Sequence, residues 1–437
     1  MTRRPTRSLR RRPTLAACVG AVTALALTAC SSGTPGAPST EATNRLEVLS
    51  WWTSASEKPA LDQLFTDYKA AHPGVEVVDL SVAGGSGSNV QVILAQRLKS
   101  GTPPDVWQTF AGASVQAYAT SGQVADVSSI YASGAYAQSL PPGIKDSMTR
   151  DGKQFGVPTG AHRSNVLFYN TAALSKAGIN PPAAGYTLDA FVADLAKAKS
   201  AGVPLCLGGK DTFTAAELFE NILLAQIGPQ GWTKIVGDSF DWNGADARAA
   251  LATFSTVLDA ADPQAGGLSW DQATAKLAKG ECAFESMNDS AYGELVRGGA
   301  EEGATFGAVA FPGTDASFVA VIDTFVVAKN AANGKNALDF LTTLTKPETQ
   351  LAFNKLKGSV PLGSDVAVDQ MSPYQQASAA ALRAGEPLLS IVHGEAMSPQ
   401  FQQGFYDAVA SFVDSRDAGA FSRTLSEAVN RRPAIAP

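Results

Sequence analysis

The chain has 437 residues, of which 45% are hydrophobic and 17% charged, and its formal net charge is −6. This length exceeds that of one ordinary domain, so we expect two lobes. The acidic balance, with no basic run after the first dozen residues, argues against nucleic acid as a partner.

The N-terminal residues predict an export signal. Six arginines and no acidic residue lie within the first twelve positions, and an apolar run then extends from Leu15 to Leu27. This run is too short for a helix that spans a membrane. Removal of the six arginines would leave 28 basic against 40 acidic residues, a net charge of −12.

The apolar run ends in Leu27-Thr28-Ala29-Cys30, which resembles the lipobox of bacterial lipoproteins. The resemblance implies a signal peptide at residues 1–29 and a lipidated cysteine at Cys30. Residues 30–45 are rich in Ser, Thr, Gly and Pro, a composition that cannot bury enough surface to fold, and they are expected to form a flexible tether. We therefore expect the protein outside the cytoplasm, lipid-anchored to the outer face of the cell membrane.

The first elements of the mature chain alternate between strand and helix. Residues 46–50 form a short apolar strand, and Leu61, Leu64, Phe65 and Tyr68 share one face of a helix that ends near His72. Residues 75–82 alternate as a second strand, and residues 90–101 form a second helix. This order predicts a parallel α/β sheet.

Trp51 and Trp52 follow the first strand directly. Neighbouring residues of a strand point to opposite faces, which would make one ring core and leave the other partly exposed. If the strand ends at Ser50, both rings instead hang from a loop over a cleft.

A glycine-rich stretch, Gly84-Gly85-Ser86-Gly87, separates the second strand from the second helix. It lacks the lysine and hydroxyl residue of a nucleotide-triphosphate loop and the full pattern of a dinucleotide-binding loop. We therefore interpret it as a flexible turn.

The middle of the chain predicts a crossover between lobes. Residues 153–170 are extended but interrupted at Val157-Pro158, and mostly helical segments follow to about Lys279, one of them capped by Thr187. Strand patterns return at 304–312 and 317–329. We expect two discontinuous lobes with a hinge cleft, the N-terminal lobe from 46–160 and 318–355 and the C-terminal lobe from 161–317 and 356–437.

Four cysteines occur, and Cys18 would leave with the signal while Cys30 carries lipid. Cys206 and Cys282 remain, a fair disulfide candidate in an oxidising compartment, although two buried thiols are the alternative. No cysteine or histidine cluster indicates a metal site, and no cofactor is expected.

Eight motifs in order carry a family resemblance: SWWTSASEKPAL, VAGGSGSN, SGTPPDVWQ, VPTGAHRSNVLFYN, GLSWDQATAKLAKGECAF, FPGTDASFVAVIDTF, KGSVPLGSD and SIVHGEA. Together they resemble the extracellular solute-binding proteins of sugar-import ABC transporters, and within them the glucose/mannose-binding branch. The resemblance implies a monomeric, two-lobed receptor of the periplasmic-binding-protein fold. It would close on a monosaccharide and deliver it to permease subunits in the membrane.

The resemblance also implies a sugar site. The residues that match the family's motifs are Trp51, Trp52, Glu57, Gln108, His162, Trp270, Asp323, Lys357 and His393. Their chemistry suits a pyranose, whose apolar faces stack on aromatic rings and whose hydroxyls need donors and acceptors. Asp323 is the most informative of them, because a lone carboxylate inside the apolar run VAVIDTFVV is costly unless something binds it.

Each of these residues also has a structural interpretation. Glu57 could lie in the first turn of its helix, and Lys357 could lie at a helix end in contact with solvent. Trp270 could belong to the core, as we expect for Trp107, Trp232 and Trp242. Two positions depart from the family's pattern, because Phe110 replaces a polar residue and Ser290 replaces a tryptophan. These departures bear on which sugar fits.

Three other functions compete with transport of a monosaccharide. A secreted glycoside hydrolase would need two carboxylates astride the scissile bond, for which Glu57 and Asp323 are the candidates. A surface lectin would have a shallow groove and no hinge. The same transport role with a small oligosaccharide is the third, and binding without catalysis is the expectation that the motifs favour.

The anchor can be tested at Cys30. The substitution Cys30→Ser removes the thiol that would accept lipid, so the protein should move from the membrane fraction into the medium. Immunoblots of both fractions measure this, with Cys18→Ser as the matched control. Retention of the Cys30→Ser protein in the membrane fraction would refute the anchor.

Overall fold

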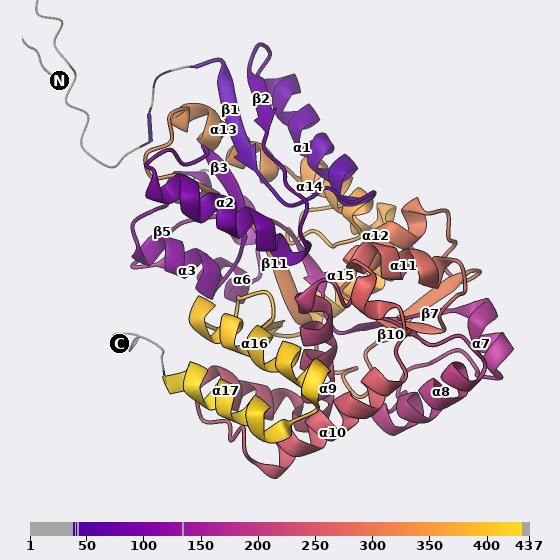
Figure 1. Ribbon diagram of the computed structural model, residues 1–437. Coiled ribbons are helices and arrows are strands. Elements are labelled where there is room, and N and C mark those ends of the chain that lie inside the picture. The colour runs from indigo at the N-terminus through magenta and orange to yellow at the C-terminus, as the bar shows by residue number, and fades with distance from the viewer. Residues whose placement is uncertain (1–37, 40, 42, 133–134, 431–437) are drawn as a thin grey trace, which may run out of the picture. The chain divides into compact units, whose positions relative to one another are not determined.

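Two β-sheets, each with its own helices, organise the computed structural model, which describes residues 38, 39, 41, 43–132 and 135–430 (Figure 1). The signal peptide and Cys30 lie outside these residues. All the described residues belong to one unit that spans residues 36–437. Within them, no helix combines the length and the apolarity that crossing a membrane requires.

The first sheet contains six strands among the described residues, ordered β12-β11-β3-β1-β2, with β6 also paired to β11. The strands are β1 (Arg45–Leu49), β2 (Glu76–Asp79), β3 (Val106–Phe110), β6 (Val157–Arg163), β11 (Val319–Val327) and β12 (Leu388–Leu389). As predicted, β1 is parallel to β2 and β3. The later strand β11, which returns from the second half of the chain, runs antiparallel to β3 and β6.

Helices cover this sheet on both sides. They are α1 (Glu57–Ala71), α2 (Ser88–Lys99), α3 (Ala113–Thr120), α4 (Ser128–Ala132), α5 (Tyr136–Ser139), α6 (Pro142–Ser147), α13 (Gly334–Leu344), α14 (Pro347–Lys357) and α15 (Pro373–Ala384). The predicted apolar face of α1 is buried, and His72 ends that helix as expected.

The second sheet contains four strands among the described residues, ordered β10-β7-β9-β8. They are β7 (Val166–Asn170), β8 (Leu205–Cys206), β9 (Phe284–Ser286) and β10 (Phe306–Ala310). The helices packed in this half are α7 (Thr171–Ala177), α8 (Leu188–Ser200), α9 (Thr212–Val236), α10 (Ala245–Asp259), α11 (Trp270–Ala278), α12 (Ser290–Arg297), α16 (Pro399–Ser415) and α17 (Ala418–Asn430). Thr187 caps α8 through the backbone N–H of Ala190, as predicted.

The chain passes from the first sheet to the second at Ser164 and Asn165, between β6 and β7. The expected interruption at Val157-Pro158 is wrong, because both residues lie inside β6. A register shift in the pairing of β6 with β11 accommodates the proline, which cannot donate to a regular ladder. Both Ser164 and Asn165 are fully buried, and Asn165 accepts from the Val319 amide at 2.9 Å, which ties the two crossing segments together.

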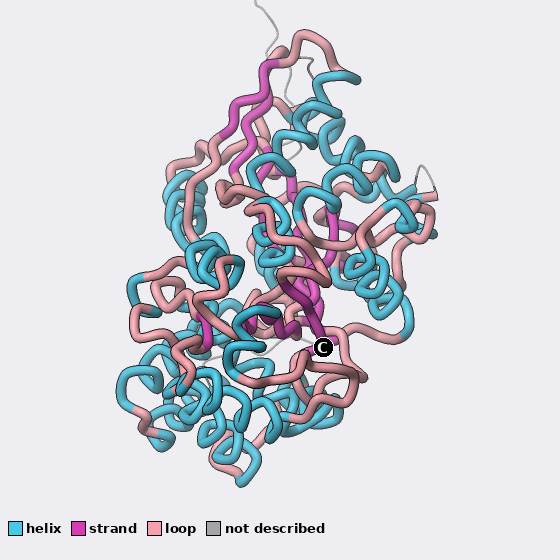
Figure 2. Tube along the Cα trace, turned by 90° about the vertical axis from the view of Figure 1, so that its right-hand side faces the viewer, coloured by secondary structure: helices cyan, strands magenta, loops and turns pink. Residues whose placement is uncertain are grey.

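Each sheet has its own hydrophobic core, and Figure 2 shows the helices that surround the strands. Trp107 lies in the first core, and Trp232 and Trp242 in the second, which confirms that these rings pack the interior. Leu362 and Leu382 also join the first core, although they fall in the segment 356–437 that we assigned to the C-terminal lobe. The lobe boundaries stay a prediction.

Cys206 and Cys282 form a disulfide between the β8 strand and the residues that lead into β9, with their Cα atoms 5.5 Å apart. Both side chains are buried in the second core.

The double substitution Cys206→Ser/Cys282→Ser should lower the free energy of unfolding. A bond that closes a loop across a sequence separation of 76 restricts the unfolded chain and contributes about 4 kcal/mol. Urea denaturation of the parent and the variant measures the loss, and the parent in reductant is the control. Equal denaturation midpoints would contradict this prediction.

Candidate functional site

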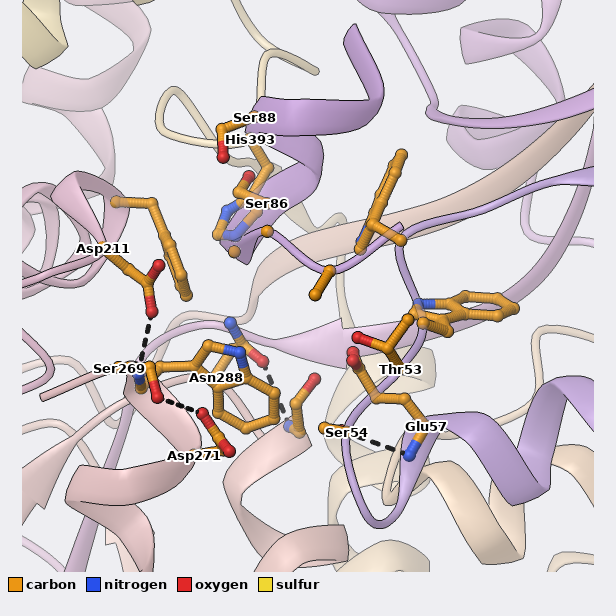
Figure 3. Close-up of a pocket in the computed structure, with 18 of the residues that line it drawn as sticks. Thr53, Ser54, Glu57, Ser86, Ser88, Asp211, Ser269, Asp271, Asn288 and His393 are labelled. Atoms are coloured by element: carbon orange, nitrogen blue, oxygen red, sulfur yellow. Dashed lines mark hydrogen bonds between the residues drawn. The ribbon is translucent and has the colours of Figure 1, made fainter. Parts of the chain in front are cut away.

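A cavity of about 540 Å³ lies where the two cores meet, and both contribute to its walls (Figure 3). The first sheet and its loops supply residues 51–54, Glu57, residues 83–86, Ser88, Asn89 and Phe110. The second half supplies Lys210, Asp211, Phe213, residues 269–271, Met287, Asn288 and Ser290. Of the nine residues predicted from the family's motifs, eight line the cavity: Trp51, Trp52, Glu57, His162, Trp270, Asp323, Lys357 and His393.

Trp51 and Trp52 follow the end of β1 and diverge in their surroundings. Trp52 is fully buried, with its ring 5.1 Å from Phe353 and 5.5 Å from Phe325 between ring centres. Trp51 keeps 7% of its surface exposed and packs against Phe110 at 5.0 Å. Both rings border the cavity and follow the end of β1, as the loop interpretation expects. Trp51 is the ring whose surface is still partly exposed.

Gln108 is the predicted residue that does not line the cavity; it lies behind it. Its side-chain oxygen accepts from Ser50 Oγ at 2.6 Å and from the Trp51 amide at 3.3 Å. Its side-chain amide donates to Asp323 Oδ1 at 3.0 Å. Gln108 therefore fixes the start of the tryptophan loop relative to the central carboxylate.

Asp323 sits where the pairing of β6 with β11 shifts register. Such an irregularity bends a strand and changes the direction of a side chain, and irregularities of this kind are common beside functional sites. The carboxylate is 3% exposed, and its Oδ2 lies 3.2 Å from His162 Nε2. Burial acts to raise the pKa of Asp323, but His162 and Lys357 outweigh it and hold the pKa below its usual value.

His162 joins two carboxylates. Its Nδ1 lies 2.5 Å from Asp289 Oδ1, and its Nε2 faces Asp323. Burial and the charge of Lys357 act to lower the pKa of His162, but Asp289 and Asp323 raise it overall. The two carboxylates therefore favour protonation of this imidazole.

Lys357, the last residue of α14, lies beside His162. Its ammonium donates to Glu57 Oε1 and to Ser290 Oγ, each at 3.0 Å, and lies 3.1 Å from His162 Nε2. The same nitrogen sits 5.4 Å from the centre of the Trp52 ring. Burial raises the pKa of Glu57, and Lys357 opposes this shift. Lys357 thus joins side chains from α1, β6 and α12 at one buried point.

His393 also lines the cavity, among aromatic rings. His393 packs edge-on against Phe110 at 5.2 Å and against Phe213 at 5.9 Å between ring centres. Burial lowers the pKa of His393 to about 3, so this imidazole is neutral. Behind it, Glu217 Oε2 accepts from the Asn288 side chain at 2.9 Å, and burial raises the pKa of Glu217 well above its usual value.

Several residues of the site were not predicted. Asp289 does not line the cavity but holds His162, and it was missed because that partner is distant in the sequence. Phe110 and Ser290, noted only as departures from the family's pattern, both line the cavity. The glycine-rich turn also lines it, together with Asp211. Among the described residues, no group of three or more His, Cys, Asp or Glu is placed to hold a metal ion.

The neutral state of His393 predicts a pH dependence of stability. The unfolded histidine binds a proton near pH 6.5, whereas the folded one does so only near pH 3. The native state therefore loses stability as pH falls through this window, by at most about 1.4 kcal/mol per pH unit. In His393→Gln this contribution is absent.

Urea denaturation of both proteins at pH 4, 5, 6 and 7 tests the point. The free energy of unfolding of the parent, minus that of His393→Gln, should increase with pH and level off above about 6.5. A difference that is constant with pH would show that His393 is not held neutral.

Comparisons with known proteins agree with this architecture. Residues 52–351 match the family model described as bacterial extracellular solute-binding protein. A probable sugar-binding periplasmic protein of Mesorhizobium japonicum is 31% identical over 84% of this chain and 88% of its own. Among solved structures, the solute receptor AcbH, described as preferring β-D-galactopyranose, matches with a TM-score of 0.77 and 18% identity, over 89% of this chain and 98% of its own. A chitin oligosaccharide binding protein matches with a TM-score of 0.76 and 19% identity, over 88% and 99%. The chain belongs to the family of bacterial extracellular solute-binding proteins.

Proposed function

We propose that this protein captures a sugar in the cavity between its two cores and delivers it to the permease of an ABC importer. The observation that carries the proposal is the composition of the cavity wall. Aromatic rings and a network of buried polar groups face the same space from both cores. The relative from Mesorhizobium japonicum, itself named as a probable sugar-binding protein, supports the same class of ligand.

The aromatic rings of the cavity suit the apolar C–H faces of a pyranose, and its polar groups suit the hydroxyls. Trp51 and Trp270 can lie against C–H faces, and both retain some exposure, at 7% and 8%. Glu57 and Asp323 can accept from hydroxyl groups, while Lys357 and His162 can donate. These hydrogen bonds involve ionised groups, which makes them stronger than bonds between neutral partners.

We further propose a monosaccharide of the glucose or mannose type. Glu57, His162 and Ser290 meet at Lys357, which would give the hydroxyls of a single ring several partners at one point. The preference described for AcbH, a structural neighbour, is also for a single pyranose. Another structural neighbour is described as a chitin oligosaccharide binding protein, so a short oligosaccharide is the alternative ligand.

Binding would favour a closed arrangement of the two lobes, because only that arrangement lets both walls contact one ligand. In this proposal the lobes have the boundaries given from the sequence and the protein acts as a monomer. Cys30 carries the lipid that keeps the receptor beside its permease. The protein has no catalytic role in this scheme.

A thermal-shift panel tests the class of ligand. At a hundred times its dissociation constant, a ligand adds about 2.7 kcal/mol to the stability of the folded protein, so the right sugar should raise the melting temperature measurably. Hexoses, pentoses and short oligosaccharides are compared. A shift with glucose or mannose is expected, and no shift with any hexose would refute the monosaccharide proposal.

Asp323→Asn should abolish most of that shift, because the carboxylate that accepts from the ligand and from His162 is lost. The matched control is Asp246→Asn at the exposed start of α10, which should respond as the parent does. Chromogenic glycosides are added to the same samples. Turnover that Asp323→Asn abolishes would identify a glycoside hydrolase instead.

A further inference from the structure

The glycine loop, residues 83–89, has a role that a flexible turn does not explain. It follows β2 and leads into α2, whose Val90 and Leu94 are buried in the first core. In Figure 3, Ser86 and Ser88 of this loop lie on one side of the cavity, and Asp211 and Ser269 of the second half lie across from them. The loop therefore borders the cavity opposite residues of the second half.

Two glycines of the loop are in contacts that leave no room for a side chain. A Cβ on Gly85 would lie 2.6 Å from Phe213 Cε1 and 2.9 Å from Asp211 Cγ, both in the second half. A Cβ on Gly87 would lie 2.7 Å from Trp51 Cε3, in the first half, and Gly87 has a φ of 76°. Gly85 needs no unusual φ, so its contact alone explains the glycine there.

Asp211 connects the glycine loop to the tryptophan on the second wall. It precedes α9, but its side chain does not cap that helix. Its Oδ2 instead accepts from the backbone N–H of Trp270 at 2.9 Å. Burial raises the pKa of Asp211, and the amides of Trp270 and Gly85 oppose this shift by favouring the carboxylate. One carboxylate thus faces groups from both sides of the cavity.

We propose that the glycine loop is a latch, in which Gly85 docks on Asp211 and Phe213 and holds the two walls together over the cavity. Asp211 is a positioning residue that fixes both the loop and the Trp270 ring. The part of this inference that concerns ligand release rests on the proposed function; the docking itself does not. The latch slows the escape of a bound sugar without contacting the polar groups that recognise it.

Hydrogen exchange of the full chain without sugar tests the docking. Gly85→Ala places a methyl group against Phe213 and Asp211, so the amides of residues 83–89 should exchange about tenfold faster than in the parent. In Asp211→Ala the Trp270 amide loses its acceptor and should exchange faster as well. The matched control is Gly266→Ala, where a Cβ meets nothing within 4 Å, and its exchange should equal that of the parent. Unchanged exchange in Gly85→Ala would overturn the latch.

Dissociation of the sugar identified by the thermal-shift panel tests the consequence. Stopped-flow tryptophan fluorescence should give a dissociation rate about tenfold higher for Gly85→Ala and no change for Gly266→Ala. Faster exchange with an unchanged dissociation rate would overturn control of release by the latch. If no sugar binds the parent, the proposed function fails, while the exchange experiment still decides whether the loop docks.

Discussion

The buried contact of His162 with Asp289 and Asp323 is the constraint on which the rest of the site depends. His162 lies on β6 in the first sheet, Asp323 on the neighbouring β11, and Asp289 directly precedes α12 in the second half. Breaking a buried ionic contact by removal of one partner costs about 3–5 kcal/mol, because the other charge is left without compensation. The position of α12 relative to the first sheet is thus tied to the ionisation of one imidazole.

The other polar groups extend this contact outward. Lys357, at the last turn of α14, donates hydrogen bonds to Glu57 and Ser290 and lies beside His162. The side-chain amide of Gln108 donates to Asp323. In the described structure these groups therefore satisfy one another. A sugar would have to match that pairing hydroxyl by hydroxyl, and an analogue that lacks one hydroxyl would leave a buried group unpaired. Selectivity in the proposed function follows from this exchange more than from the size of the cavity.

The sequence predicted the features that depend on local patterns. The parallel pairing of β1 with β2 and β3, the Thr187 cap and the bond between Cys206 and Cys282 are confirmed. The unusual position of Asp323 in an apolar strand was also visible, because burial of a lone carboxylate is costly.

Features that depend on distant partners were not predicted. The strand β6 was expected to break at Val157-Pro158, but a register shift opposite β11 accommodates the proline. The role of Asp289 needed knowledge of its contact with His162, and the glycine loop looked like a turn because Asp211 and Phe213 are far away in the sequence. Gln108 was predicted from its motif as a residue that binds the sugar, but in the fold it contacts Ser50 and Asp323 and does not line the cavity.

The central position of β11 has a consequence for how the chain acquires its structure during synthesis. This strand joins β3, β6 and β12 in the first sheet, yet it is made long after β3 and β6. Until residue 327 has emerged, the earlier strands lack their shared neighbour and offer open edges to other chains. A nascent chain paused before this point would be prone to aggregate, so the first core depends on a late segment for its protection.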